Sequence, residues 1–319
     1  MVLTVREARP GEYARVGDLT VAAYTADRDV GDYADSLRDV ESRAKAARVL
    51  VAVDDDGTVL GSATNVLDGG PYGEIARENE GEFRMLAVDP AAQGRGVGTA
   101  LVRACADEAR RLGRERLVLS SGEWMRAAHR IYGRLGFARI PERDWTPAPG
   151  VRLHAYSLDL IRPARPDEYD AISDLTVRVY ASLEGGLHPE YAAILRRTAE
   201  RAATAKVVVA VEGGTLLGSL TYVRGPGPEA SIATEGEAEF RTLVVDPDAQ
   251  GRGVGRGLVR WSLNRARADG CRALVLSTMP WMRVAHGLYE RMGFVRTPDR
   301  DWHPRPEIVC WTYGLDVTW

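Results

Sequence analysis

The chain has 319 residues, which is more than a typical single domain and enough for two. Its net charge of −3 argues against a nucleic-acid-binding surface, and no apolar run approaches the roughly 20 residues needed to cross a bilayer. The first residues lack the layout of a signal peptide, and Cys105, Cys271 and Cys310 form no C-x-x-C pair, so we expect a cytoplasmic protein without a metal site.

Hydrophobic periodicity predicts alternating helices and strands in the first half of the chain. Apolar residues recur with helical spacing over residues 12–24 and 33–47. Strands are predicted over residues 49–53, 59–65, 82–88 and 116–120, with a long helix before the last of them. A helix over residues 125–135 and two closing strands follow. This order is typical of a mixed α/β domain.

The second half of the chain repeats the first. Arg143-Asp144-Trp145 recurs 157 positions later as Arg300-Asp301-Trp302, and the offset holds at 157 from Gly61 onward. It changes by one or two residues only in turn-rich stretches, where a folded domain tolerates insertions. We therefore predict two domains of one fold, over residues 1–160 and 161–319.

A glycine-rich loop follows the same predicted strand in both halves. The strand ends at Asp-Pro, and Gln-Gly-Arg-Gly-Val-Gly then opens a helix at residues 93–98 and 250–255. Glycine lets a ligand approach backbone N–H groups, and a helix N-terminus favours an anion. The pattern lacks both the nucleoside-triphosphate loop G-x-x-x-x-G-K-[ST] and the dinucleotide fingerprint G-x-G-x-x-G. Two identical loops favour pyrophosphate binding over a turn that needs glycine for local geometry alone.

The loops resemble the [Q/R]-x-x-G-x-[G/A] signature of the GNAT superfamily of N-acetyltransferases. The segments 128–137 and 285–294, which read A-x-x-x-Y-x-x-x-G-F, resemble the family's element on the helix after the fifth strand. The resemblance covers nearly the whole chain. It implies two tandem GNAT-like domains, each a central mixed β-sheet flanked by helices, with acetyl-CoA or another acyl-CoA as cosubstrate.

The same resemblance implies which residues bind the donor. They lie on the end of the fourth strand and on the loop of each half. In the first half they are Leu86, Ala87, Val88, Gln93, Gly94, Arg95, Gly96, Val97, Gly98 and Thr99. In the second half they are Val244, Val245, Gln250, Gly251, Arg252, Gly253, Val254, Gly255 and Arg256.

Acyl transfer to an amine also requires a base, because an alkylamine is mostly protonated at neutral pH. Glu82 and Glu239 each lie eleven residues before the loop Gln, where some GNAT enzymes place their general base. An ordinary charged strand end is the alternative interpretation. Glu80 and Glu237 are second candidates that could act through water.

Tyr132 and Tyr289 match the family tyrosine that lies near the thioester sulfur and returns a proton to it. His129 and His286 precede these tyrosines by three residues, so they could tune the phenol, although we expect half-buried helix residues. For the repeated Arg-Asp-Trp motif we expect a structural corner, with a wall of the acceptor pocket as the alternative.

We therefore predict an acyl-CoA-dependent N-acyltransferase with a general base and a tyrosine acid in each half. Neither half lacks a loop glycine or the tyrosine, which favours two working sites over one catalytic and one structural or acyl-CoA-binding domain. A non-enzymatic acyl-CoA sensor is the third hypothesis. The acidic run before the fourth strand favours a cationic small-molecule amine. A peptide amine and a homodimer stay open, and no nucleic acid or membrane partner is expected.

Overall fold

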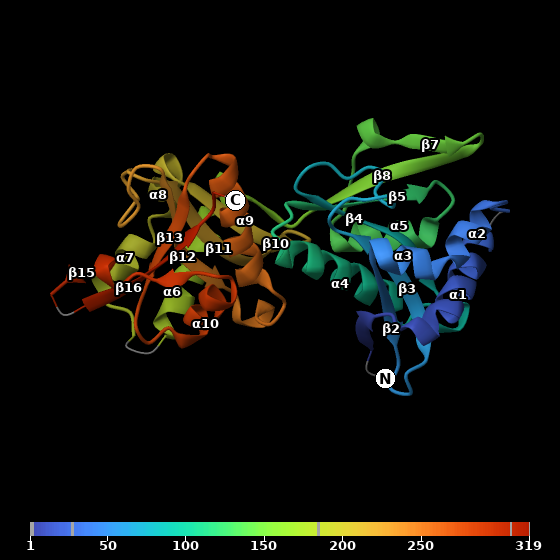
Figure 1. Ribbon diagram of the computed structural model, residues 1–319, viewed down its shortest axis with the longest axis horizontal. Coiled ribbons are helices and arrows are strands. Elements are labelled where there is room, and N and C mark those ends of the chain that lie inside the picture. The colour runs from blue at the N-terminus through green and yellow to red at the C-terminus, as the bar shows by residue number, and fades with distance from the viewer. Residues whose placement is uncertain (1–2, 27–28, 184–185, 307, 319) are drawn as a thin grey trace. The chain divides into compact units, whose positions relative to one another are not determined.

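A computed structural model describes the chain except for residues 1–2, 27–28, 184–185, 307 and 319. The chain divides into two compact units, and the main division falls between Leu160 and Ile161. Unit 1 denotes the part before this point and unit 2 the part after it (Figure 1). No helix in the described ranges combines the length and the apolar character that crossing a membrane requires.

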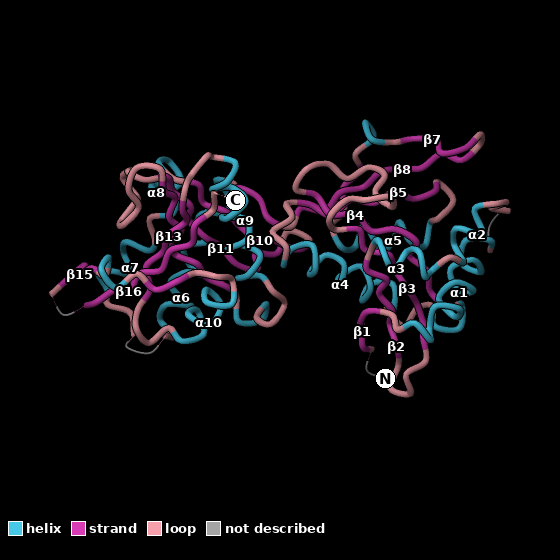
Figure 2. The backbone as a smooth tube through the Cα atoms, viewed as in Figure 1, coloured by secondary structure: helices cyan, strands magenta, loops and turns pink. Residues whose placement is uncertain are grey.

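Unit 1 is a mixed sheet with helices around it (Figure 2). The sheet order is β1-β2-β3-β4-β5-β8-β6, with β7 paired to β8. Of the strand pairs in the described residues, only β4 and β5 run parallel. The elements are β1 (Thr4–Glu7), α1 (Tyr13–Thr25), α2 (Tyr33–Arg38), α3 (Val40–Ala46), β2 (Arg48–Val53), β3 (Val59–Val66), β4 (Glu80–Val88), α4 (Val97–Arg111), β5 (Arg116–Gly122), α5 (Arg126–Leu135), β6 (Ala138–Arg139), β7 (Trp145–Ala148) and β8 (Val151–Asp159).

Unit 2 repeats this arrangement, with the sheet order β14-β16-β13-β12-β11-β10-β9 and β15 paired to β16. The two matching mixed sheets confirm the predicted fold class. The elements are β9 (Ile161–Pro163), α6 (Tyr169–Ala181), α7 (Pro189–Leu195), α8 (Thr198–Thr204), β10 (Lys206–Glu212), β11 (Thr215–Arg224), β12 (Glu237–Val245), α9 (Val254–Ala268), β13 (Ala273–Thr278), α10 (Arg283–Arg291), β14 (Val295–Arg296), β15 (Trp302–Arg305) and β16 (Ile308–Asp316).

The structure has two helices where the sequence predicts a single helix. The segment 33–47 breaks at Asp39, whose backbone leaves the helical region with φ −75° and ψ 71°. Its side chain accepts a hydrogen bond from the Ser42 N–H and so caps α3. The prediction of one helix was wrong because apolar spacing continues through both helices and hides the cap.

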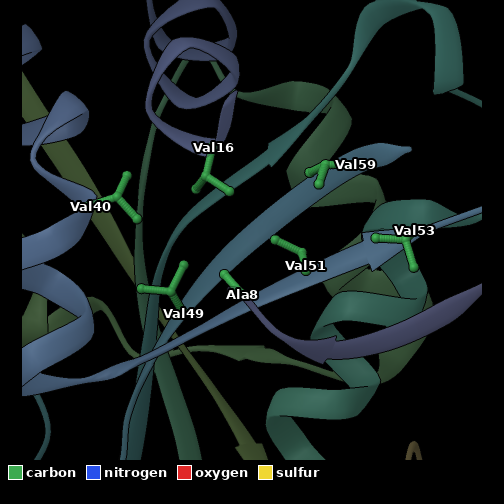
Figure 3. Close-up of a cluster of buried hydrophobic side chains, with 7 residues drawn as sticks. All are labelled: Ala8, Val16, Val40, Val49, Val51, Val53 and Val59. Carbon is green, nitrogen blue, oxygen red and sulfur yellow. The ribbon is translucent and has the colours of Figure 1, made fainter. Parts of the chain in front are cut away.

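Helices cover both faces of the central strands, which is why β2 and β3 are buried along nearly their whole length. On one face, Val49, Val51 and Val53 of β2 meet Val16 of α1 and Val40 of α3 (Figure 3). On the other face, β3 approaches α4 so closely that a Cβ on Gly61 would lie 2.7 Å from Val97 Cγ1. Glycine at this position therefore lets the helix that follows the loop pack on the sheet.

The parallel pair β4–β5 separates part-way along its length. Pairing is confined to Glu80–Glu82 of β4 and Arg116–Val118 of β5, although β4 continues to Val88 and β5 to Gly122. Opposite this opening, the β3–β4 register shifts between Ser62 and Thr64, and Met85 takes a φ of 52°. In unit 2 the parallel pair β12–β13 is equally short, the β11–β12 register shifts in the same place, and Thr242 takes a φ of 48°. A β-bulge therefore bends the strand where it leaves its neighbour.

The Arg-Asp-Trp motif forms a structural corner in both units. Arg143 donates to both oxygens of Glu80, at 2.5 and 3.0 Å, and ties the start of β4 to the turn before β7. Asp144 accepts from Arg139 and from the Ala155 N–H, which joins the same turn to β8. The Trp145 indole N–H donates to Ser120 Oγ at 3.0 Å.

In unit 2, Arg300 binds Glu237 and Asp301 accepts from Arg296 in the same way. Burial by itself would raise the pKa of Glu237, but hydrogen bonds from Arg300 and from the backbone of Thr234 outweigh it. The pKa of Glu237 is therefore lowered to about 2.

This shift predicts how stability depends on pH. Because the folded pKa of Glu237 lies below the ordinary value of about 4.3, its contribution is present above that value and is lost as the pH falls towards 2. We expect Glu237→Gln to be less stable than the parent at pH 7 and to lose less stability on acidification, measured by urea unfolding between pH 7 and 2. Glu235→Gln, at an exposed neighbour, is the control. Equal slopes for the Glu237→Gln variant and the parent would show that this ion pair does not couple folding to protons.

Candidate active site

The glycine loop has the same geometry in both units. Gly94 and Gly96 have φ of 76° and 83°, and Gly251 and Gly253 have φ of 77° and 81°. A Cβ on Gly94, Gly96 or Gly251 would meet no atom within 4 Å, so these glycines are needed for backbone conformation rather than for space. Gly98 differs, because its Cβ would lie 2.8 Å from Ile131 of α5.

These loops fit the pyrophosphate that the sequence predicts. Helices α4 and α9 begin at Val97 and Val254, directly after the left-handed glycines. The first N–H groups of a helix have no intrahelical acceptor and lie at the positive end of its dipole. Open space beside Gly94, Gly96 and Gly251 therefore combines with backbone donors, which suits a bound anion.

In unit 2 the loop opens into a pocket of about 910 Å³. The lining comes from α6, β12, the loop, β13 and α10, so the pocket lies where β12 and β13 separate. Of the predicted residues, Val245, Gln250, Gly251, Gly253, Val254, Gly255, Arg256 and Tyr289 line it. Among the described residues, Val244, Arg252 and Glu239 do not belong to this lining.

The two predicted tyrosines lie in equivalent places. Tyr132 of α5 is 4% exposed and Tyr289 of α10 is 5% exposed, and each packs edge-on against the phenylalanine of the neighbouring strand, Phe83 or Phe240. Burial raises the pKa of both phenols, although a hydrogen bond with Ser121 opposes the rise for Tyr132. Both side chains therefore carry their proton at neutral pH and can donate it.

The candidate base Glu82 is fully buried and uses its two oxygens differently. Oε2 accepts the backbone N–H groups of Glu74, Ile75 and Ala76 at 2.9, 3.0 and 3.1 Å. Oε1 has no hydrogen-bond partner among the described residues. Glu239 repeats this with residues 231–233, and its Oε1 likewise has no hydrogen-bond partner in the described part of the chain. One oxygen therefore holds the loop before the strand, while the other is buried and accepts no hydrogen bond, and in unit 2 it lies 3.8 Å from Arg241 Nε.

The second candidates are less suited to proton transfer. Glu80 accepts from Arg143 on both oxygens and from the Arg77 N–H on Oε2. Glu237 is bound by Arg300 in the same bidentate way. Both carboxylates serve the structural corner. In the described ranges, no three His, Cys, Asp or Glu side chains come together in a way that could hold a metal ion.

Sequence reasoning missed an aromatic and cationic cluster beside the catalytic candidates. In unit 1, Tyr24 and Tyr33 have ring centroids 6.3 Å apart, and Arg84 donates to the Tyr72 carbonyl and pairs with Glu74. Unit 2 repeats it with Tyr180, Tyr191, Arg241 and Glu229, and Tyr180 and Arg241 line the pocket. The signal was available, because both tyrosines and the arginine recur in register with the repeat.

The cluster also distinguishes the two units. Burial raises the pKa of Glu74 to about 7, against the opposing effect of Arg84. Serine occupies the equivalent position 231 in unit 2. The arginine of the cluster therefore pairs with a carboxylate at position 74 in unit 1 and with Glu229, the counterpart of Tyr72, in unit 2.

The units differ at the start of α5 and α10 as well. In unit 1 the indole of Trp124 packs over Gly122, where a Cβ would lie 2.6 Å from the ring. Met279 stands at the position equivalent to Gly122, and Trp281 is 41% exposed and lines the pocket. The residue at this position, Gly122 in unit 1 and Met279 in unit 2, therefore sets where the following tryptophan lies.

Comparison with known proteins identifies the family. The model of the acetyltransferase (GNAT) family matches residues 13–137 and again residues 169–294. A mycothiol acetyltransferase of Cellulomonas flavigena is 30% identical over 66% of this chain, which spans 64% of that protein, less than two thirds of its length. A mycothiol acetyltransferase of Acidothermus cellulolyticus is 31% identical over 78% of this chain and 77% of its own length.

Among solved structures, a GNAT-family acetyltransferase from Staphylococcus aureus is 12% identical with a TM-score of 0.41, and it covers 50% of this chain and 99% of its own. A protein from Salmonella typhimurium, described as a candidate acetyltransferase and solved with acetyl-CoA, is 25% identical with a TM-score of 0.39, over 52% of this chain and 99% of its own. The two matches of the family model together cover more than half of the sequence. The chain therefore belongs to the GNAT family of N-acetyltransferases, with one family match in each unit.

Proposed function

We propose that residues 1–160 and 161–319 are two acetyltransferase domains, each of which transfers an acetyl group from acetyl-CoA to a primary amine. The observation that carries this proposal is the recurrence of one geometry. In both units a left-handed glycine loop, a buried tyrosine and a buried glutamate with one oxygen that accepts no hydrogen bond flank the separation of two parallel strands. A degenerate domain would be expected to lose at least one of these.

The donor would lie in the opening between the parallel strands, with its pyrophosphate on the loop. Arg95 and Arg252 are the loop cations that could reach a phosphate. The backbone of β4 and β12 beyond the paired segment is free of the neighbouring parallel strand, so the N–H groups that face away from β3 and β11 are available to the carbonyl oxygen. Acetyl-CoA is the first donor to test, and a longer acyl-CoA is the second.

The chemistry assigns one role to each side chain. Glu82 or Glu239 accepts a proton from the amine through Oε1, while Oε2 keeps the loop in place. The amine nitrogen then attacks the thioester carbonyl, a C–N bond forms and the C–S bond breaks. Tyr132 or Tyr289 donates its proton to the departing sulfur.

The acceptor we favour is a small-molecule amine, and the acceptor of the mycothiol acetyltransferases is the first to test because relatives of that name match most of this chain. The acidic run before the fourth strand supports a cationic acceptor. A peptide amine is the alternative acceptor. The alternative functions are an enzyme with a single working domain and a non-enzymatic acyl-CoA sensor. For location and assembly, we propose a cytoplasmic protein and a homodimer.

The loop assignment predicts which glycine substitutions abolish activity. Glutamate at Gly96 or Gly253 places a carboxylate and a strained backbone where the pyrophosphate would bind. We expect each single variant to lose the activity of one domain and the double variant to lose all thioester cleavage. Thiol release from acetyl-CoA is the measurement, with spermidine, L-lysine, a lysine peptide and the mycothiol acetyltransferase acceptor.

Gly57→Glu and Gly270→Glu are the controls, because both glycines have a positive φ, as Gly96 and Gly253 do, and lie with open space in other turns. Full activity in the double loop variant would refute the loop assignment. Activity that disappears with one loop variant alone would show that only one domain turns over.

The side-chain roles predict a second set of variants, made in a chain that already carries Gly253→Glu. Glu82→Gln keeps an oxygen for the three backbone N–H groups but removes the base, and Tyr132→Phe removes the proton donor. We expect each to lower kcat by about 10²-fold or more without loss of acetyl-CoA binding. Glu78→Gln, at an exposed site in the same loop, serves as the control. An unchanged kcat in either variant would remove that residue from the mechanism.

A further inference from the structure

The tryptophan before α10 is exposed on the wall of the unit 2 pocket. Trp281 is 41% exposed and lines the pocket into which the glycine loop opens. Val284, in the first turn of α10, is 90% exposed and lines the same pocket. Apolar surface of this kind, rimmed by charged residues, is typical of a ligand-binding groove. The two side chains therefore present an apolar surface to the molecule that occupies the pocket.

Helix α10 fixes where this surface lies relative to the glycine loop. A Cβ on Gly255 would lie 3.6 Å from Leu288, so the middle of α10 packs beside the last glycine of the loop. Val284 precedes Leu288 by four residues and shares its side of the helix, and Trp281 comes three residues earlier still. The apolar surface therefore begins about one helical turn beyond the loop, in the direction that leads away from Tyr289.

The aromatic cluster of unit 2 marks the other end of the pocket. Tyr180 lines the pocket, and its ring centroid lies 6.0 Å from that of Tyr191. Burial raises the pKa of Tyr180, and the nearby phenols of Tyr191 and Tyr289 add to the rise. A donor with its thioester near Tyr289 and its pyrophosphate on the loop would therefore continue past the loop towards Trp281. The part of acetyl-CoA that follows the pyrophosphate is adenosine with a 3′-phosphate.

Two exposed arginines line the pocket at the end where both helices start. Arg256 belongs to the first turn of α9, and Arg283 is the first residue of α10. The positive end of each helix dipole also favours an anion there. Adenosine 3′-phosphate offers a planar base and a phosphate, which are the groups that an aromatic ring and guanidinium groups bind. This end of the pocket therefore matches that occupant in chemistry and in charge.

Unit 1 holds the equivalent tryptophan in a different position. Trp124 is half-buried, and its indole packs over Gly122, where a Cβ would lie 2.6 Å from the ring. Unit 1 is not short of positive charge, because Arg126 and Arg130 lie on the matching helix α5. The difference between the units at this place is therefore the exposed aromatic surface rather than the charge.

We propose that Trp281 is a stacking platform for the adenine of acetyl-CoA in unit 2, where Arg256 and Arg283 bind the 3′-phosphate, and that unit 1 binds its donor without such a platform. The proposal rests on the proposed function, because it names the residues that bind one end of the same donor. Trp281 contacts neither the thioester nor the amine in this scheme. It therefore affects the affinity for the donor and not the chemical step.

The test measures donor binding by the full chain with Gly96→Glu, so that only the loop of unit 2 is intact. Acetyl-CoA is titrated by calorimetry without any amine. S-acetyl-4′-phosphopantetheine, which lacks the adenylate half, is measured by competition with acetyl-CoA. The ratio of the second Kd to the first gives the contribution of the adenylate half. We expect Trp281→Ala to lower this ratio about tenfold, the usual size of stacking between a base and an aromatic side chain.

Two aromatic variants serve as controls for this ratio. Trp281→Phe keeps a ring on which the base can stack, so most of the ratio of the parent should remain. Trp124→Ala, in a chain that carries Gly253→Glu instead, is the matched control in unit 1. It should leave the ratio unchanged, because the indole of Trp124 already packs over β5.

The arginines are tested with 3′-dephospho-acetyl-CoA, which differs from acetyl-CoA only in the phosphate that they are proposed to bind. We expect Arg256→Ala and Arg283→Ala each to weaken the binding of acetyl-CoA severalfold more than that of the dephosphorylated donor. Equal losses for the two donors would remove both arginines from the 3′-phosphate site.

An unchanged ratio in Trp281→Ala would overturn the platform, and an equal fall in Trp124→Ala would overturn the difference between the units. A lower molecular mass of Trp281→Ala in light scattering, with the ratio unchanged, would assign the exposed surface to a contact between copies of the chain. Absence of any acetyl-CoA binding by the Gly96→Glu parent would instead contradict the proposed donor site of unit 2, so the two failures are distinguishable.

Discussion

The separation of the parallel strands is the constraint on which the site of each unit depends. The strands pair over only three residues and then diverge, and a β-bulge at Met85 or Thr242 bends one of them away. Two neighbouring strands in a closed sheet would satisfy each other's backbone groups and leave no room for a ligand. Their divergence leaves backbone donors beside an opening that the glycine loop and the tyrosine helix border.

The buried carboxylates stabilise this opening at its narrow end. Glu82 and Glu239 each hold three consecutive N–H groups, which closes the preceding loop over the strands. Beside them, the bidentate arginine of the Arg-Asp-Trp motif fixes the first residue of the same strand. A buried carboxylate with one oxygen that accepts no hydrogen bond is costly, so its recurrence in both units supports a role in proton transfer as well as in structure.

The sequence was sufficient for the structural elements that depend on local pattern. The loop glycines, the helix that follows them and the tyrosine lie in short motifs whose geometry is set within a few residues. The break at Asp39 was missed because a side-chain cap can interrupt a continuous apolar stripe. The dual use of Glu82 was also not predictable, because its partners are backbone groups of a loop whose fold no motif specifies.

The histidines show the limit most clearly. His129 and His286 occupy the same position of the same motif, yet one binds a serine hydroxyl and the other a backbone carbonyl. Their ring neighbours also differ, since His129 stacks on a histidine of β8 and His286 on a tryptophan of β16. The repeat therefore preserves the glycine loop and the buried tyrosine, while the hydrogen-bond partner of Nε2 in the neighbouring histidine differs.

The central claim is that each unit forms its own donor site, and the stoichiometry of acetyl-CoA binding tests it most directly. Isothermal titration calorimetry of the full chain with acetyl-CoA, in the absence of any amine, should give two sites per chain. A stoichiometry of one would contradict the account, because it would mean that two loops of the same geometry do not both bind the donor.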